Sequence, residues 1–201
     1  MAVTIWGLQA QAALAQGSRY VVLMGDSLFA CATGFLGGRP IVNLAVGGQT
    51  AAGILATQVP RLADVAGSNA VGVVCMPGMN DLPGLEAGTT TWAAWTATAT
   101  AIVNGILAAG FPSAHVLMCS PPPTQAAADF PYSMGMEAEL VAVCQPRGVV
   151  VCSMPQLFTD GTSAFPPNPA YYLNPGDGVH ESTEAWLKIY NPVLGGIVAT
   201  W

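Results

Sequence analysis

Charged residues are scarce in this sequence. Only 8% of its 201 residues are charged, and the formal net charge is −6. One lysine and four arginines are scattered along the chain, whereas a nucleic-acid site needs a basic stripe that neutralises phosphates. The composition therefore argues against nucleic acid as a partner.

Metal-ligand patterns are also missing. The chain has two histidines and five cysteines, and no two cysteines stand in a Cys-x-x-Cys spacing. The odd number of cysteines argues against a full disulfide framework, and three of the five lie in apolar runs where cysteine is usually a small buried hydrophobe. We expect no metal site.

Long hydrophobic runs are absent as well. The chain is 52% hydrophobic, but Gly, Pro, Thr or a charge interrupts every run before the roughly 18 residues of a membrane span. Residues 1–18 form a leading segment in which "ALAQ" resembles a cleavage site, yet no basic stretch precedes it, so a signal peptide is not indicated. We expect one domain over residues 1–201 and no membrane span, and the compartment stays open.

What the chain does contain is an alternation of short apolar runs with longer helical patterns. Continuous apolar runs are typical of parallel strands that helices cover on both faces. We therefore predict an α/β fold, a three-layer α/β/α sandwich with about five parallel strands. The expected strands are 20–24, 40–46, 70–76, 115–120 and 148–154, and the expected helices are 50–66, 91–109, 133–146 and a last one from near Ser182. Residues 155–181 are rich in Pro, Gly, Asn and Asp and are predicted to be loop.

Small polar segments follow the predicted strands. Because ligands of such folds bind beyond the carboxyl ends of the strands, these segments should gather at one edge of the sheet. They are Gly25-Asp26-Ser27, the "GGQT" of 47–50, the "PGMNDLPG" of 77–84 and Asp177-Gly178-Val179-His180.

These residue types suit nucleophilic catalysis. A serine hydroxyl needs a base to take its proton, and a carboxylate that orients the base, so Ser27, His180 and Asp177 form a candidate triad. A tetrahedral intermediate needs donors for its oxyanion, and the backbone N–H groups of Ser27 and Gly48 with the side-chain amide of Asn80 are the candidates.

The four segments resemble the ordered blocks of the SGNH (GDSL-type) hydrolase family over residues 20–190. The matching stretches are Gly25-Asp26-Ser27-Leu28, "NLAVGGQT" with Gly48, Gly78-Met79-Asn80-Asp81, and Asp177 with His180. The resemblance implies a flavodoxin-like sandwich and a serine esterase that works through an acyl-enzyme without metal or organic cofactor.

Two residues depart from the family pattern, and they bear on the substrate. Met79 stands where a small or polar residue is frequent, and Glu181 stands where proline is common. Loops over a sheet edge often shape a substrate groove, so Tyr171 and Tyr172 join Met79 as predicted substrate contacts. The small size favours short acyl chains such as acetyl, including O-acetyl groups of carbohydrates.

Several alternatives stay open. Within the family these are a lipase or lysophospholipase and a thioesterase, and outside it a catalytically silent carbohydrate-binding or structural module. An α/β-hydrolase would want Gly-x-Ser-x-Gly, but Leu28 and Phe29 follow Ser27. A nucleotide or flavin binder lacks its glycine-rich loop. The sequence does not indicate an oligomeric state.

Overall fold

The fold is known from a computed structural model that describes residues 17–32, 34–67, 69–172, 178–180, 182 and 185–201. Within these residues six strands form one sheet in the order β2-β3-β1-β4-β5-β6. Five of them run parallel: β1 (Tyr20–Gly25), β3 (Arg39–Asn43), β4 (Ala70–Met76), β5 (Val116–Cys119) and β6 (Val150–Cys152). The predicted α/β sandwich with its five parallel strands is confirmed, and all but the last two residues of the leading segment lie outside the described part.

A two-residue edge strand was not foreseen from the sequence. β2 (Phe35–Leu36) pairs antiparallel with the start of β3. It is too short to show a hydrophobic period, and glycines flank it on both sides, so the pattern reads as a turn.

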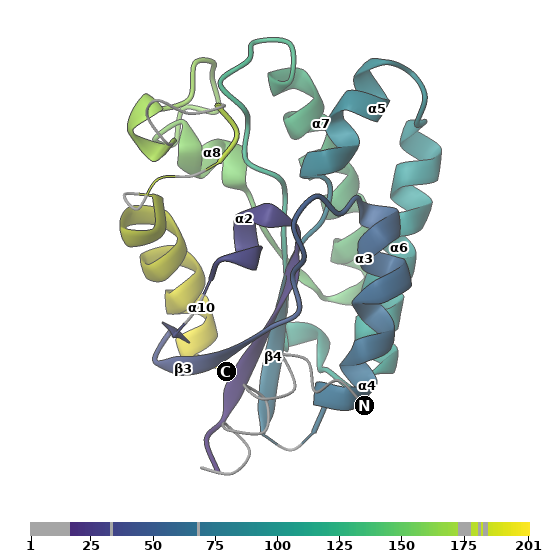
Figure 1. Cartoon of the computed structure of the whole chain (residues 1–201), viewed down its shortest axis with the longest axis vertical. Helices are drawn as coiled ribbons and strands as arrows, with labels where there is room; N and C mark the ends of the chain where they lie inside the picture. The colour runs from purple at the N-terminus through teal and green to yellow at the C-terminus, as the bar shows by residue number, and fades with distance from the viewer. Residues whose placement is uncertain (1–16, 33, 68, 173–177, 181, 183–184) are drawn as a thin grey trace.

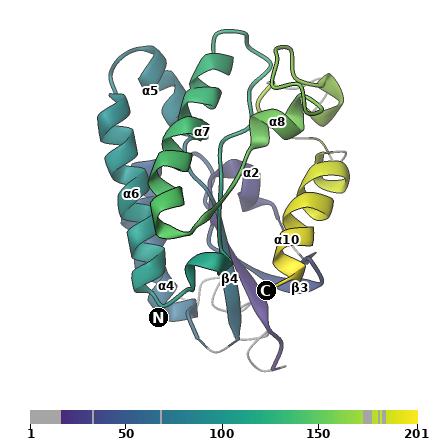
Figure 2. The ribbon, with the colours of Figure 1, turned by 180° about the vertical axis from the view of Figure 1, so that it is seen from behind.

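Helices cover both faces of the sheet. Figures 1 and 2 show α3 and α6 on one side and α10 on the other, and α6 packs against both α3 and α7. The α-helices are α2 (Ser27–Ala30), α3 (Ala51–Thr57), α4 (Leu62–Val65), α5 (Leu82–Glu86), α6 (Trp92–Ala108), α7 (Phe130–Cys144), α8 (Met154–Phe158) and α10 (Gly195–Ala199). The 3₁₀ turns are η1 (Val59–Arg61), η2 (Met79–Asp81), η3 (Ser113–His115), η4 (Gln145–Arg147) and η5 (Pro169–Tyr171), and η6 (Trp186–Leu194) is a π-helix.

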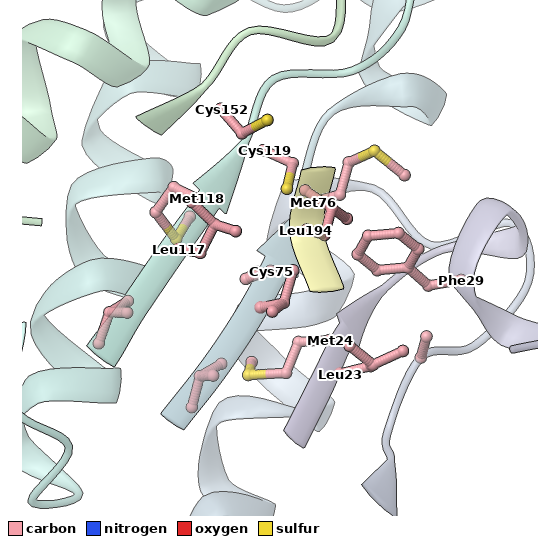
Figure 3. Close-up of a cluster of buried hydrophobic side chains, with 14 of the residues drawn as sticks. Leu23, Met24, Phe29, Cys75, Met76, Leu117, Met118, Cys119, Cys152 and Leu194 are labelled. Atoms are coloured by element: carbon pink, nitrogen blue, oxygen red, sulfur yellow. The ribbon is translucent and has the colours of Figure 1, made fainter. Parts of the chain in front are cut away.

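The core lies between the sheet and these helices. Every residue of β1 is buried, which explains why its apolar run does not alternate. In Figure 3, Leu23 and Met76 of neighbouring strands lie near Phe29 of α2 and Leu194 of η6. The ring of Phe29 also meets Tyr190 edge-on, with 5.8 Å between the ring centroids. The short helix that follows β1 is thereby held against the sheet.

Two helical segments differ from the prediction. The last helix contains the wider π-turns of η6, and Pro192 lies inside that stretch, where it lacks the N–H that an α-helical bond requires. α8 occupies the start of the predicted loop 155–181. The sequence feature that indicates this helix is its N-terminal cap. The Ser153 hydroxyl accepts a bond from the Gln156 N–H at 3.3 Å, and Pro155 lies in the first turn.

None of the helices in the described part of the chain has the length and apolar content that a membrane span requires.

Candidate active site

The nucleophile candidate stands at the carboxyl end of a central strand. β1 ends at Gly25, whose φ of +154° and close approach to the Met76 carbonyl oxygen, 3.1 Å from where a Cβ would lie, suit glycine. The Asp26 carboxylate caps α2 by accepting a bond from the Leu28 N–H at 3.0 Å. Ser27 is the first residue of α2, so its position is determined by a buried strand and a capped turn.

The base candidate meets this serine from the far end of the chain. The His180 Nε2 atom lies 3.0 Å from the Ser27 Oγ atom, although 153 residues separate them in sequence. This is hydrogen-bonding distance for a base that removes the serine proton. The predicted third member, Asp177, and the neighbouring Glu181 lie outside the described residues, so the triad carboxylate stays a prediction.

Asn80 reaches the same site from the loop after β4. The preceding Gly78 has φ +121°, which turns the chain into η2. The Asn80 side-chain nitrogen donates to the Asp26 Oδ2 atom at 3.2 Å and to the Gln49 carbonyl oxygen at 3.1 Å. Together with the contact between His180 and Ser27, these bonds bring residues of all four predicted polar segments to one site.

The glycine loop after β3 also borders the serine. A Cβ on Gly47 would lie 3.8 Å from the Ser27 Cβ atom. Gly48 is exposed, has φ +76° and has open space where a Cβ would be, so its backbone is accessible to a ligand. Its role as an oxyanion donor stays a prediction.

Asn43 supports the site in a way that the sequence did not reveal. Its buried side-chain amide donates to the carbonyl oxygens of Phe29 at 2.6 Å and Ala32 at 3.0 Å, and accepts from the Ala45 N–H at 2.9 Å. It therefore ties the end of β3 to the helix of the nucleophile. A polar residue that ends an apolar strand run was the available signal.

Two buried carboxyl groups shape the electrostatics. Burial raises the pKa of Asp26 to about 6, although the Leu28 N–H, His180 and Asn80 favour the ionised form. Burial also raises the pKa of Asp81, whose Oδ2 atom accepts a bond from the Ala51 N–H at 2.7 Å. The negative charge of Asp81 raises the pKa of Asp26 further.

The predicted substrate contacts are packed into the protein. Met79, Tyr171 and Tyr172 are 5%, 7% and 2% exposed, and both tyrosine rings meet Phe158 edge-on. The Tyr171 hydroxyl donates to Asp160 at 2.7 Å, and the Tyr172 hydroxyl donates to the Pro123 carbonyl oxygen. Such buried rings leave little surface for a substrate, so the structure favours a packing role for them. The sequence could not show this, because two aromatic residues in a Pro-rich loop look the same whether they face inward or outward.

Outside this site, the described residues offer few groups for catalysis or metal binding. Among the described residues, no three His, Cys, Asp or Glu side chains gather as a metal site would require. A pocket at the opposite edge of the sheet has no titratable or nucleophilic side chain in its lining, which is Ala66, Gly67, Ala70, Ala109, Gly110, Phe111 and Pro112. His115 stacks on Trp201 near that edge, and its Nδ1 atom lies 2.9 Å from the Val71 carbonyl oxygen, which indicates a structural role.

Solved structures share this architecture. The chain superposes on a GDSL-like lipase from Bacteroides thetaiotaomicron with a TM-score of 0.69 and 16% identity, covering 98% of both chains. The protein has the SGNH (GDSL-type) hydrolase fold. An α/β hydrolase from the Lake Arreo metagenome gives a TM-score of 0.69 at 14% identity, over 90% of this chain and 96% of that one. An acetylxylan esterase from Geobacillus stearothermophilus gives 0.64 at 13%, over 90% and 91%.

The likeness in fold is not accompanied by a detectable match over the sequence as a whole. The sequence matches no protein-family model and no curated protein.

Proposed function

We propose that the protein is a serine ester hydrolase that acts through an acyl-enzyme. The observation that carries this proposal is the 3.0 Å contact between Ser27 Oγ and His180 Nε2, with Asn80 held beside the same turn. The lipase, the α/β hydrolase and the acetylxylan esterase that share this fold support it.

The first half of the reaction forms a covalent ester on the enzyme. His180 takes the Ser27 proton as the hydroxyl oxygen attacks the ester carbonyl, and Asp177 orients the imidazole. The N–H groups of Ser27 and Gly48 and the Asn80 amide stabilise the oxyanion. The intermediate collapses, the acyl group stays on Ser27, and the leaving alcohol receives its proton from His180.

The second half regenerates the serine. A water molecule gives a proton to His180 and attacks the acyl carbonyl, and the same donors hold the second oxyanion. Collapse of that intermediate returns the proton to Ser27 and releases the carboxylic acid. Neither half needs a metal or an organic cofactor.

The resting contacts of Asn80 set a condition on this mechanism. Its amide has two hydrogens, and they serve Asp26 and Gln49. Donation to an oxyanion therefore replaces or bifurcates one of these bonds. The oxyanion, which carries a full charge, is the stronger acceptor than the Gln49 carbonyl, so we assign the exchange to that bond.

The substrate we propose is a short-chain ester, and specifically an acetyl-type ester that includes O-acetyl groups on carbohydrate. The acetylxylan esterase among the similar structures supports this choice, and the lipase keeps longer acyl chains as the second candidate. A thioesterase and a catalytically silent carbohydrate-binding module are the remaining alternatives.

The test is hydrolysis of p-nitrophenyl esters from acetate to palmitate, together with release of acetate from acetylated xylan. Wild type should turn over the short esters fastest, and Ser27→Ala should lose at least about 10³-fold in kcat. Ser113→Ala, a half-buried serine in η3 outside the site, is the matched control and should keep full activity. Equal rates for wild type and Ser27→Ala on every ester would refute the proposal.

A further inference from the structure

One buried side chain lies between the turn that carries Ser27 and the loop that carries Gly48 and Gln49. Gln58 follows the last residue of α3 and is 1% exposed. A buried amide is costly unless its donors and acceptor are paired, and this one is fully engaged. Its nitrogen donates to the Gly25 carbonyl oxygen at 2.6 Å and to the Gln49 Oε1 atom at 2.5 Å, and its oxygen accepts from the Gly25 N–H at 2.9 Å.

The bonds to Gly25 complete the hydrogen bonding at the end of β1. The Gly25 carbonyl oxygen accepts a bond from the Val46 N–H at 3.2 Å, which continues the pairing of β1 with the segment after β3. The Gln58 side-chain nitrogen donates to the same carbonyl oxygen, and its oxygen accepts from the Gly25 N–H. Gln58 therefore reinforces this pairing two residues before Ser27.

The bond to Gln49 joins that turn to the oxyanion side. Gln49 follows Gly48 directly, and its carbonyl oxygen accepts the bond from Asn80. Its side-chain nitrogen donates to the Thr57 hydroxyl at 2.8 Å, so the Gln49 side chain is held at both ends. Gln58 therefore touches the strand end that carries the serine and the residue that links the two oxyanion candidates.

We propose that Gln58 is a positioning residue that sets the spacing between Ser27 and the oxyanion donors, an inference that rests on the ester-hydrolase function. It contacts no reacting atom. Its amide holds the Gly25 backbone and the Gln49 side chain at one separation, and catalysis is sensitive to that separation because a displacement of about 1 Å can cost about 10²-fold in rate.

The test compares three variants with p-nitrophenyl acetate. Gln58→Met keeps the length of the side chain and removes all three bonds. Gln49→Met removes the side-chain bonds to Gln58 and Thr57 and keeps the carbonyl oxygen that Asn80 uses, because that oxygen belongs to the backbone. Gln145→Met is the matched control, because Gln145 is exposed in η4 and its side chain makes none of the described hydrogen bonds.

The rates are expressed per active site, titrated with diisopropyl fluorophosphate, so that unfolded protein does not count. We expect kcat per titrated site to fall about 10- to 100-fold in Gln58→Met and about 3- to 10-fold in Gln49→Met, with KM within twofold of wild type. Gln145→Met should stay within twofold on both constants.

A Gln58→Met protein that loses thermal stability but keeps wild-type kcat per titrated site would overturn the proposal and leave Gln58 a structural residue. If Gln58→Met does not fold, Gln49→Met decides by the same criterion. Failure of the proposed function has a different signature, because wild type itself would then neither hydrolyse the ester nor react with the fluorophosphate.

Discussion

Replacing Asp26 by asparagine should destabilise the folded protein at acid pH and stabilise it at alkaline pH. Asp26 is fully buried, and its carboxylate accepts bonds from the Leu28 N–H and the Asn80 side chain. Asparagine has the same shape and keeps an oxygen for Leu28. It places an NH₂ group toward Asn80, so one buried bond is lost at every pH, at a cost of about 1 kcal/mol.

The pH-dependent part follows from the raised pKa. The folded protein holds the Asp26 proton up to about pH 6, whereas the unfolded chain releases it near 3.8. Below pH 3.8 both states are protonated and the carboxyl group carries no penalty. As the pH rises from 3.8 to 6 the folded state resists ionisation, so wild type loses about 3 kcal/mol, at 1.36 kcal/mol for each pKa unit. The asparagine variant does not lose this stability, because its side chain does not ionise.

Urea unfolding at pH 4, 5, 6, 7 and 8 measures the difference. Asp26→Asn should be less stable than wild type by about 0.5 kcal/mol at pH 4, where Asp26 of the unfolded chain is already partly ionised, and more stable by about 2 kcal/mol at pH 8. Asp64→Asn, an exposed carboxylate on α4, is the control that removes a charge outside the site. If the wild-type and Asp26→Asn stabilities remained parallel from pH 4 to pH 8, burial would not destabilise the Asp26 carboxylate and the reasoning would be refuted.

Three further substitutions test the packing and the supports of the site. Gly72→Ala should destabilise the protein by about 1–3 kcal/mol in thermal melts, because a Cβ there would lie 2.5 Å from the Trp201 ring; an unchanged melting temperature would contradict that close approach. Tyr172→Phe loses the hydroxyl bond to Pro123, so stability should fall by about 0.5–1.5 kcal/mol with KM unchanged, whereas a raised KM at full stability would restore its role as a substrate contact. Asn43→Ala removes the side-chain partner of the Ala32 carbonyl oxygen and of the Ala45 N–H, and we expect a loss of at least about 2 kcal/mol with a reduced kcat; urea unfolding and ester kinetics check both, and wild-type values would show that this amide is dispensable.

The sheet could be predicted because its physics is local. A strand buried on both faces is a continuous apolar run, and β1 and β4 show such runs at almost the observed bounds. The location of the site at one edge of the sheet could be predicted from topology, because the carboxyl ends of parallel strands lie on the same side. Ser27, His180 and Asn80 were predicted on that basis, and the structure brings them together.

The supports of the site could not be predicted, because they depend on contacts between distant segments. The Asp26–Asn80 bond joins residues 54 apart, and the Gln58–Gly25 bonds join residues 33 apart. Polar side chains of this kind read as solvated turn or helix residues in the sequence. The burial of Tyr172 was hidden for the same reason, since its partners come from a loop 49 residues earlier and from α8.

The most direct test of the account is to locate the reactive residue. Wild type is incubated with diisopropyl fluorophosphate, which reacts with an activated serine much faster than with an ordinary one, and the digest is analysed by tandem mass spectrometry, with His180→Ala run in parallel. We predict one adduct per chain, on Ser27, formed at least about 10²-fold more slowly in His180→Ala, because the imidazole 3.0 Å away supplies the activation. An adduct on another serine, or an unmodified Ser27 in folded wild type, would contradict the central claim that Ser27 is the nucleophile.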